Sequence, residues 1–123
     1  MIRVENISKK FGEHIVLDDI SVNFERGKTN LIIGQSGSGK TVLMKICTGL
    51  FEPDSGLIAF DNRQFSNTKE KNRINIRKEM GVLFQGGALF DSMNVEENVM
   101  FPLNMFTDMS YEEKIERVNF CLN

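Results

Sequence analysis

The stretch from Gly34 to Thr41 constrains the fold of this chain more than any other. Its eight residues read Gly-Gln-Ser-Gly-Ser-Gly-Lys-Thr and fit the pattern G-x-x-x-x-G-K-[ST]. An apolar run rich in β-branched residues, 29–33, precedes the glycines and predicts a buried strand. Residues 42–47 then begin a helical pattern. The order strand, glycine loop, helix is the context that a phosphate-binding loop requires.

The chemistry of phosphate explains the residue types in this stretch. Glycines allow a tight turn in which successive N–H groups point at an oxyanion, and the following helix adds its own unpaired N–H groups. A lysine supplies a positive charge for the outer phosphates, and a threonine hydroxyl is suited to ligate Mg²⁺. We therefore predict that the phosphates of a nucleotide and Mg²⁺ are held by Gly34, Gln35, Ser36, Gly37, Ser38, Gly39, Lys40 and Thr41, with Thr41 as a Mg²⁺ ligand.

The loop has two other interpretations. One is a chance match, because glycine turns between strands and helices are common. A dinucleotide-binding loop is disfavoured because the Lys40-Thr41 pair is present, and because no acidic residue ends a second strand at the expected distance.

The bulk composition narrows the class of protein. A chain of 123 residues can form one core of ordinary size, and its net charge of −2 argues against nucleic-acid binding through general basicity. Residues 61–90 carry six basic and three acidic groups, whereas residues 91–123 carry two basic and seven acidic groups. We interpret this asymmetry as two solvated faces. No run approaches about 18 consecutive apolar residues, and residues 1–5 lack the layout of a signal peptide.

The cysteines and the histidine favour no metal centre. Cys47 and Cys121 are isolated from each other and predict small core residues in a reducing compartment. His14 is the only histidine, so no histidine metal cluster or conventional triad can form, and it is expected on a surface loop.

The remaining elements follow from periodicity and turn residues. We expect strands at 2–8 and 15–24, joined by a turn at 9–13 into an antiparallel pair. The helix after Lys40 should end near Thr48 with Gly49 as its cap. We also expect a turn at 52–56, a strand at 57–60, a short helix within 66–79 and a second buried strand at 80–84.

Two capping boxes predict helices in the last part of the chain. The first begins at Asn94 and the second at Ser110. Pro102 should end the first helix, because the residue before a proline avoids helical angles. The second helix should carry one apolar stripe, made of Tyr111, Ile115, Val118 and Leu122.

Over nearly its whole length, the chain resembles the nucleotide-binding subunit of an ABC transporter. Phe11, just before Gly12, matches the A-loop aromatic residue that stacks on adenine in that family. Gln85, after the apolar run 80–84, matches the Q-loop glutamine that reaches Mg²⁺ and the attacking water. Without the resemblance, Phe11 would be a packed turn aromatic and Gln85 a residue bonding to backbone at a strand end.

The sequence of residues 84–99 is similar to that of one group within the family. This segment resembles the ATPases of Mla-type (MCE-associated) phospholipid transport systems of Gram-negative bacteria. The matching residues read Gln-x-Gly-Ala-Leu-Phe-Asp-Ser and then Val-x-Glu-Asn-Val. Amino-acid importers and lipoprotein-release ATPases share much of this layout. The resemblance implies a permease docking surface at Leu89, Phe90 and Met93, although an ordinary helical core would use the same residues.

The resemblance also implies partners and a location. A second copy of the subunit would complete a homodimer around two ATP molecules. A membrane permease would be a further partner, an MCE-domain protein is another candidate partner, and no nucleic acid is expected. The protein would lie on the cytoplasmic face of the inner membrane.

Several family motifs are absent from these 123 residues: a Leu-Ser-Gly-Gly-Gln signature, an apolar strand ending in Asp-Glu, and a switch histidine. The chain therefore resembles about the first half of the domain. The expected fold is α/β, a truncated P-loop NTPase of the ABC ATPase type. Residues 1–28 would begin an antiparallel β-subdomain with the A-loop, residues 29–85 the P-loop core strand and helix up to the Q-loop, and residues 86–123 the start of a helical subdomain.

The missing motifs predict that this segment does not hydrolyse ATP at a useful rate by itself, because no residue would activate water. Two other functions stay open at this point. One is a P-loop ATPase or kinase without a membrane partner, which the position of Phe11 and Gln85 disfavours. The other is a regulatory fragment that binds nucleotide without turnover.

Overall fold

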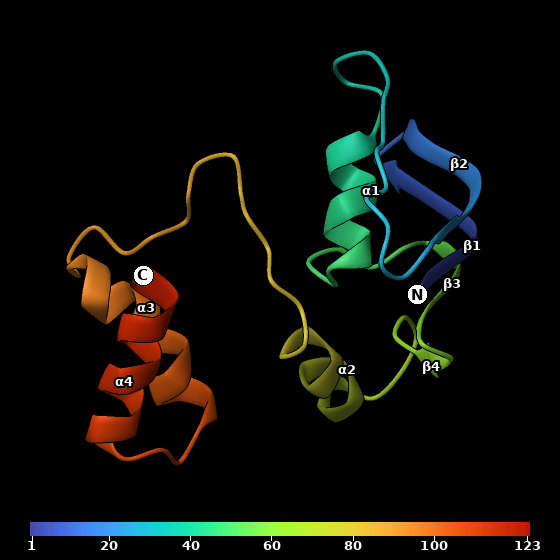
Figure 1. Cartoon of the computed structure of the whole chain (residues 1–123). Helices are drawn as coiled ribbons and strands as arrows, with labels where there is room; N and C mark the ends of the chain where they lie inside the picture. Colours follow the sequence, from blue (N-terminus) through green and yellow to red (C-terminus); the bar gives the residue numbers. More distant parts are fainter. The chain divides into compact units, whose positions relative to one another are not determined.

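A computed structural model describes all residues, 1–123, and groups them into two compact units, Met1–Val82 and Leu83–Asn123. Each unit is described by itself. The first contains a sheet and two helices, and the second contains two helices (Figure 1).

The sheet of the first unit is antiparallel. Its strands are β1 (Ile2–Phe11), β2 (His14–Phe24), β3 (Ser55–Phe60) and β4 (Arg63–Gln64), in the order β2-β1-β3-β4. The expected pairing of the first two strands is confirmed. β1 is longer than expected, because Lys10 and Phe11 still pair with Ile15 and His14, so the turn is reduced to Gly12 and Glu13.

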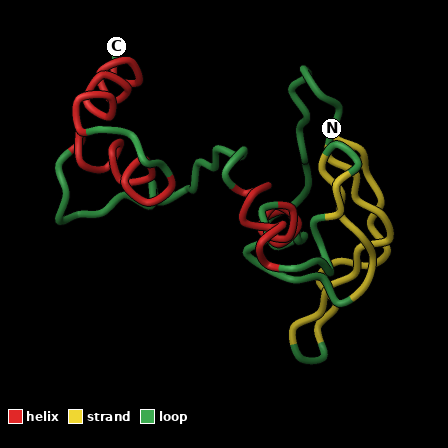
Figure 2. Tube along the Cα trace, turned by 90° about the horizontal axis from the view of Figure 1, so that it is seen from below, coloured by secondary structure: helices red, strands yellow, loops and turns green.

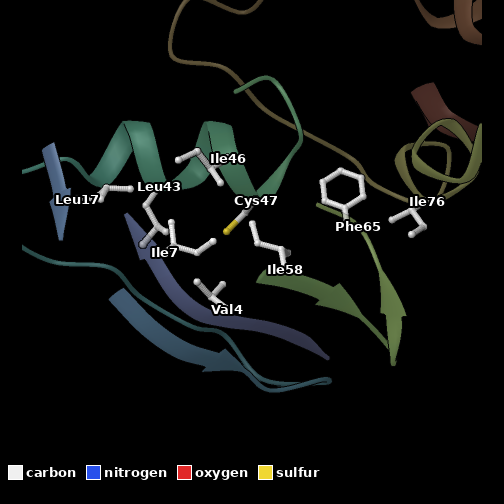
Figure 3. Packing of buried hydrophobic residues seen from close by; sticks show 9 residues of the cluster. All are labelled: Val4, Ile7, Leu17, Leu43, Ile46, Cys47, Ile58, Phe65 and Ile76. Atoms are coloured by element: carbon white, nitrogen blue, oxygen red, sulfur yellow. The ribbon is translucent and has the colours of Figure 1, made fainter. Parts of the chain in front are cut away.

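Helix α1 (Lys40–Cys47) packs on this sheet and buries the core (Figure 3). The apolar cluster consists of Val4, Ile7, Leu17, Leu43, Ile46, Cys47, Ile58, Phe65 and Ile76. Cys47 is buried and is a core residue as expected, and this burial raises the pKa of its thiol to about 11. Cys121 is exposed, and its expected burial is wrong.

The end of α1 is capped as the sequence indicated. Gly49 has a φ of 72°, and its N–H donates to Ile46 O at 3.0 Å, while Leu50 N–H donates to Lys45 O at 2.8 Å. This pair of bonds is the Schellman arrangement. Helix α2 (Glu70–Arg77), the expected short helix, lies against the same end, because Arg73 and Arg77 both donate to Gly49 O.

Two expected strands are wrong. Residues 29–33 and 80–84 form no strand and pair with none, and the chain between β2 and α1 is drawn as loop in Figure 2. Leu31, Ile33 and Leu83 are 82%, 81% and 92% exposed. A central parallel strand is stabilised by neighbours on both sides and by cover on both faces. All four paired strands of these 123 residues belong to the antiparallel sheet, so neither run has that environment.

The second unit is formed by α3 (Val95–Phe106) and α4 (Tyr111–Leu122), which pack on each other; Met100 of α3 and Val118 of α4 are buried. Both expected capping boxes are confirmed. Asn94 Oδ1 accepts from Glu97 N–H at 2.9 Å, and Ser110 Oγ accepts from Glu113 N–H at 3.3 Å.

Two details of these helices were expected differently. α3 does not end before Pro102 but continues to Phe106, since burial of Met100 and contact of Phe101 with the Phe90 ring hold the flanking residues in place. The expected stripe of α4 is only partly covered: Val118 is buried and Ile115 half-buried, whereas Tyr111 and Leu122 are exposed. One neighbouring helix can cover only part of the stripe.

Candidate functional site

The glycine loop leads directly into the N-terminus of α1. Gly39 is the N-cap, with φ 86°, and no side chain caps the helix. The first bond along the helix runs from Leu43 N–H to Gly39 O at 2.9 Å, so the N–H groups before Leu43 have no helical acceptor. The first turn contains no acidic residue. This end of α1 is therefore suited to an anion.

The loop is pressed against β2, and glycine is required there. A Cβ added at Gly39 would lie 2.7 Å from Val16 O and 2.9 Å from Leu17 Cδ2. A Cβ added at Gly34 would lie 2.8 Å from Ser38 Oγ, the end of a flexible side chain of the loop itself, so the contact with β2 requires glycine at Gly39 only. Only a residue without a side chain allows the loop to approach this closely.

Lys40 places its ammonium group inside the loop. Its Nζ donates to Gly34 O at 2.8 Å and to Gln35 O at 2.6 Å. An ammonium group has three donors, so one remains for a ligand. Ser38 N–H donates to Gln35 O at 3.2 Å and closes the turn. The loop thus holds a positive charge at the centre of its own carbonyls and beside the free end of α1.

These residues fit a bound triphosphate with Mg²⁺. The loop 34–41 contains no carboxylate and one cation, Lys40. The Thr41 hydroxyl lies in the first turn of α1 on an exposed residue. Mg²⁺ is commonly held by few protein ligands together with phosphate oxygens and water, so one hydroxyl is a sufficient contribution from this loop. Gln35, Ser36 and Ser38 are exposed and complete the rim.

Phe11 lies at the last position of β1, at the turn of the β1–β2 hairpin. Its side chain is 46% exposed, and its ring meets that of Phe51 at a centroid distance of 5.6 Å and an interplanar angle of 67°. The Lys9 ammonium lies 5.6 Å from the Phe11 ring centroid. Phe51 follows α1, so Phe11 is placed against the C-terminal side of the helix whose N-terminus forms the loop. Stacking on adenine by Phe11 stays a prediction.

Asp54 ties the hairpin to the turn before β3, a contact that sequence reasoning missed. Its carboxylate accepts from Lys9 Nζ at 2.7 Å and from Lys10 N–H at 2.8 Å. These two hydrogen bonds hold the pKa of Asp54 below its usual value. The turn at 52–56 was expected from its proline and glycine, but no local pattern indicates the distant partner of Asp54.

Gln85 belongs to the second unit, whereas the glycine loop belongs to the first. It is exposed and sits in a turn closed by a 3.0 Å bond from Gly87 N–H to Phe84 O. Its contact with Mg²⁺ and water stays a prediction.

The predicted docking residues lie on a loop organised by Asn98, a residue that sequence reasoning did not single out. Asn98 Oδ1 accepts from Phe90 N–H at 2.8 Å, and Asn98 Nδ2 lies within 3.2 Å of the Phe90, Met93 and Asn94 carbonyl oxygens. Leu89 and Phe90 are exposed and Met93 is half-buried. The only sequence signal for this role of Asn98 is its position four residues after the helix cap Asn94.

The comparison with protein families decides the class. A family model described as ABC transporter matches residues 17–122. This chain belongs to the ABC transporter family. The match begins within β2 and includes the glycine loop, both helices of the first unit and nearly all of the second unit.

Curated relatives include proteins named for different cargoes. The intermembrane phospholipid transport ATP-binding protein MlaF is 36% identical in Haemophilus influenzae and 38% in Escherichia coli K12, over 89% of this chain and 41% and 40% of those proteins. The probable ribonucleotide transport ATP-binding protein mkl of Mycobacterium leprae is 37% identical over 91% of this chain and 32% of that protein. The chain therefore spans less than half the length of these relatives.

Solved structures share the fold. A dimeric ATP-binding cassette in a post-hydrolysis state, bound to ADP and Pi, aligns with a TM-score of 0.86 and 32% identity, covering 99% of this chain and 56% of that one. A Clostridium perfringens subunit of the cbiONQ ABC transporter complex aligns with a TM-score of 0.81 and 29% identity, covering 98% and 48%. The expected fold, the N-terminal part of an ABC ATPase, is confirmed. None of its helices is both long and apolar enough to cross a membrane.

Proposed function

We propose that this chain is the ATP-binding part of an ABC transporter subunit that binds MgATP and, in the complete protein, hydrolyses it to drive transport. One observation carries the proposal: Lys40 is held at the centre of the glycine loop, at the uncapped N-terminus of α1. The positive end of the helix, its free N–H groups and the third donor of Lys40 all favour a triphosphate. The ADP and Pi bound by a similar cassette support the same assignment.

Within this site we assign a role to each predicted residue. Gly34, Gln35, Ser36, Gly37, Ser38 and Gly39 supply the loop around the phosphates, and Thr41 a hydroxyl for Mg²⁺. Phe11 supplies a face for adenine, and Gln85 orients Mg²⁺ and water in the complete protein. Bound Mg²⁺ would neutralise charge that develops on the phosphates.

We also propose phospholipid as the cargo. Support comes from the similarity to MlaF and from the wording of residues 84–99. The ribonucleotide transport named for mkl, at similar identity, is the competing cargo. Copurification of the complete protein with its permease, followed by mass spectrometry of the bound cargo, distinguishes the two.

The partners follow from the same proposal. A second subunit would complete the ATP sites; similar cassettes are dimeric, which supports a dimer. The exposed Leu89 and Phe90, with Met93, would dock a permease on the cytoplasmic face of the membrane. An MCE-domain protein would be a further partner.

The test is Lys40→Ala, measured by titrating the chain with a fluorescent ATP analogue and Mg²⁺. We expect binding to fall below detection, since the only cation of the loop is removed. Lys28→Ala is the matched control, because Lys28 is a solvent-exposed lysine of the same loop region that pairs with Glu25. Unchanged affinity in Lys40→Ala would discard the assignment of the loop.

A further inference from the structure

We propose that Phe51 is a positioning residue for adenine recognition. It holds the ring of Phe11, the face that the proposed function assigns to adenine, against the end of α1. The inference therefore rests on the proposed function, and it adds a residue that lies in neither the glycine loop nor the hairpin.

The position of Phe51 is set by α1. Its N–H donates to Lys45 O at 3.2 Å, in the last turn of the helix, and its half-buried side chain packs against the core cluster. The Lys45 ammonium lies 5.1 Å from the Phe51 ring centroid. The backbone hydrogen bond, the packing against the core cluster and the Lys45 ammonium together restrict the orientation of the Phe51 ring.

Phe11, by contrast, is fixed in the sheet by its backbone and carries a more exposed ring. It pairs with His14 at the end of the hairpin, and nearly half of its side chain is exposed. Its ring meets Phe51 edge-on at 5.6 Å, an arrangement that aromatic pairs prefer. The Lys9 ammonium that also contacts this ring is itself held by Asp54. Phe51 thus supplies an aromatic contact that orients the exposed ring.

One rigid element links the two halves of the site through this contact. α1 has eight residues and is about 12 Å long, with the glycine loop at its first turn and Phe51 just beyond its last. Phe51 therefore fixes the position of the Phe11 ring relative to the glycine loop. Its loss should weaken ligands that carry a base and leave inorganic triphosphate unaffected.

The experiment measures affinities for MgATP and for inorganic tripolyphosphate with Mg²⁺ in the 123-residue chain and its variants. We expect Phe51→Leu to weaken MgATP about two- to tenfold, the range of one aromatic pair, with tripolyphosphate unchanged. Phe51→Tyr keeps the ring and should bind like the parent. Phe60→Leu is the matched control, since Phe60 is a half-buried member of another edge-on pair, with Phe65 at 5.0 Å.

The variant Phe11→Leu distinguishes failure of the adenine contact by Phe11 from failure of the positioning role of Phe51. If Phe51 acts through Phe11, Phe51→Leu has no further effect in the Phe11→Leu background. Loss in Phe11→Leu but none in Phe51→Leu overturns the inference alone. No MgATP-specific loss in Phe11→Leu overturns the adenine platform itself. Equal weakening of MgATP and tripolyphosphate in Phe51→Leu, or a similar loss in Phe60→Leu, also overturns the inference, since it marks a general structural effect.

Discussion

Gly39 serves two purposes in this chain. It turns the backbone into α1 with a φ of 86°, and it lets β2 approach the loop, with Val16 O only 2.7 Å from where a Cβ would be. Gly37 also has a positive φ, of 80°, but nothing lies within 4 Å of a Cβ added there. The two glycines therefore allow conformational strain and steric exclusion to be measured separately.

We predict that Gly37→Ala lowers the free energy of unfolding by about 1–2 kcal/mol, the cost of a left-handed conformation. Gly39→Ala should cost about 2–5 kcal/mol, because the overlap with Val16 and Leu17 adds to that strain. Urea denaturation followed by circular dichroism measures both. Equal losses in the two variants would show that the loop does not press on β2.

At the scale of elements, local capping bonds determine where α3 and α4 begin, whereas tertiary packing determines where α3 ends. The capping boxes at Asn94 and Ser110 begin α3 and α4 as the sequence alone predicts, because the bonds involved are local. Pro102 fails to end α3, because packing of Met100 and Phe101 favours a continuous helix over the preference of the residue before proline.

The loop that precedes α3 depends on one side chain, and this leads to a prediction. Asn98→Ala removes the bonds from Asn98 to Phe90, Met93 and Asn94. We expect a loss of about 1–2 kcal/mol, since these bonds are partly exposed to solvent. Hydrogen exchange should accelerate at the Phe90 amide.

The control for this variant is Asn104→Ala, an exposed asparagine of the same helix. It should leave exchange in the loop unchanged. Protection of the Phe90 amide that is identical in Asn98→Ala and in the parent would contradict the role of Asn98.

At the scale of the molecule, the chain is divided into two compact units, and two apolar runs remain without strand partners. The glycine loop and Phe11 belong to the first unit, while Gln85 and the predicted docking residues belong to the second. These 123 residues contain no Asp-Glu strand end and no Leu-Ser-Gly-Gly-Gln signature.

We therefore predict MgATP binding without turnover by the 123-residue chain. Phosphate positioning alone does not orient and deprotonate the attacking water. Release of inorganic phosphate should match that of a no-protein blank, while titration shows saturable binding. Phosphate release that exceeds the blank and disappears in Lys40→Ala would contradict this prediction.

The sequence by itself determined the features that depend on neighbouring residues. The glycine loop, the Gly49 cap, the capping boxes and the first hairpin all use bonds between residues close in the chain, so local patterns predict them. The tertiary structure alone decided the contact of Phe11 with Phe51, the tie of Asp54 to the hairpin and the course of α3 through Pro102. It also decided that residues 29–33 form no strand, because a strand of a parallel sheet exists only where other strands lie beside it.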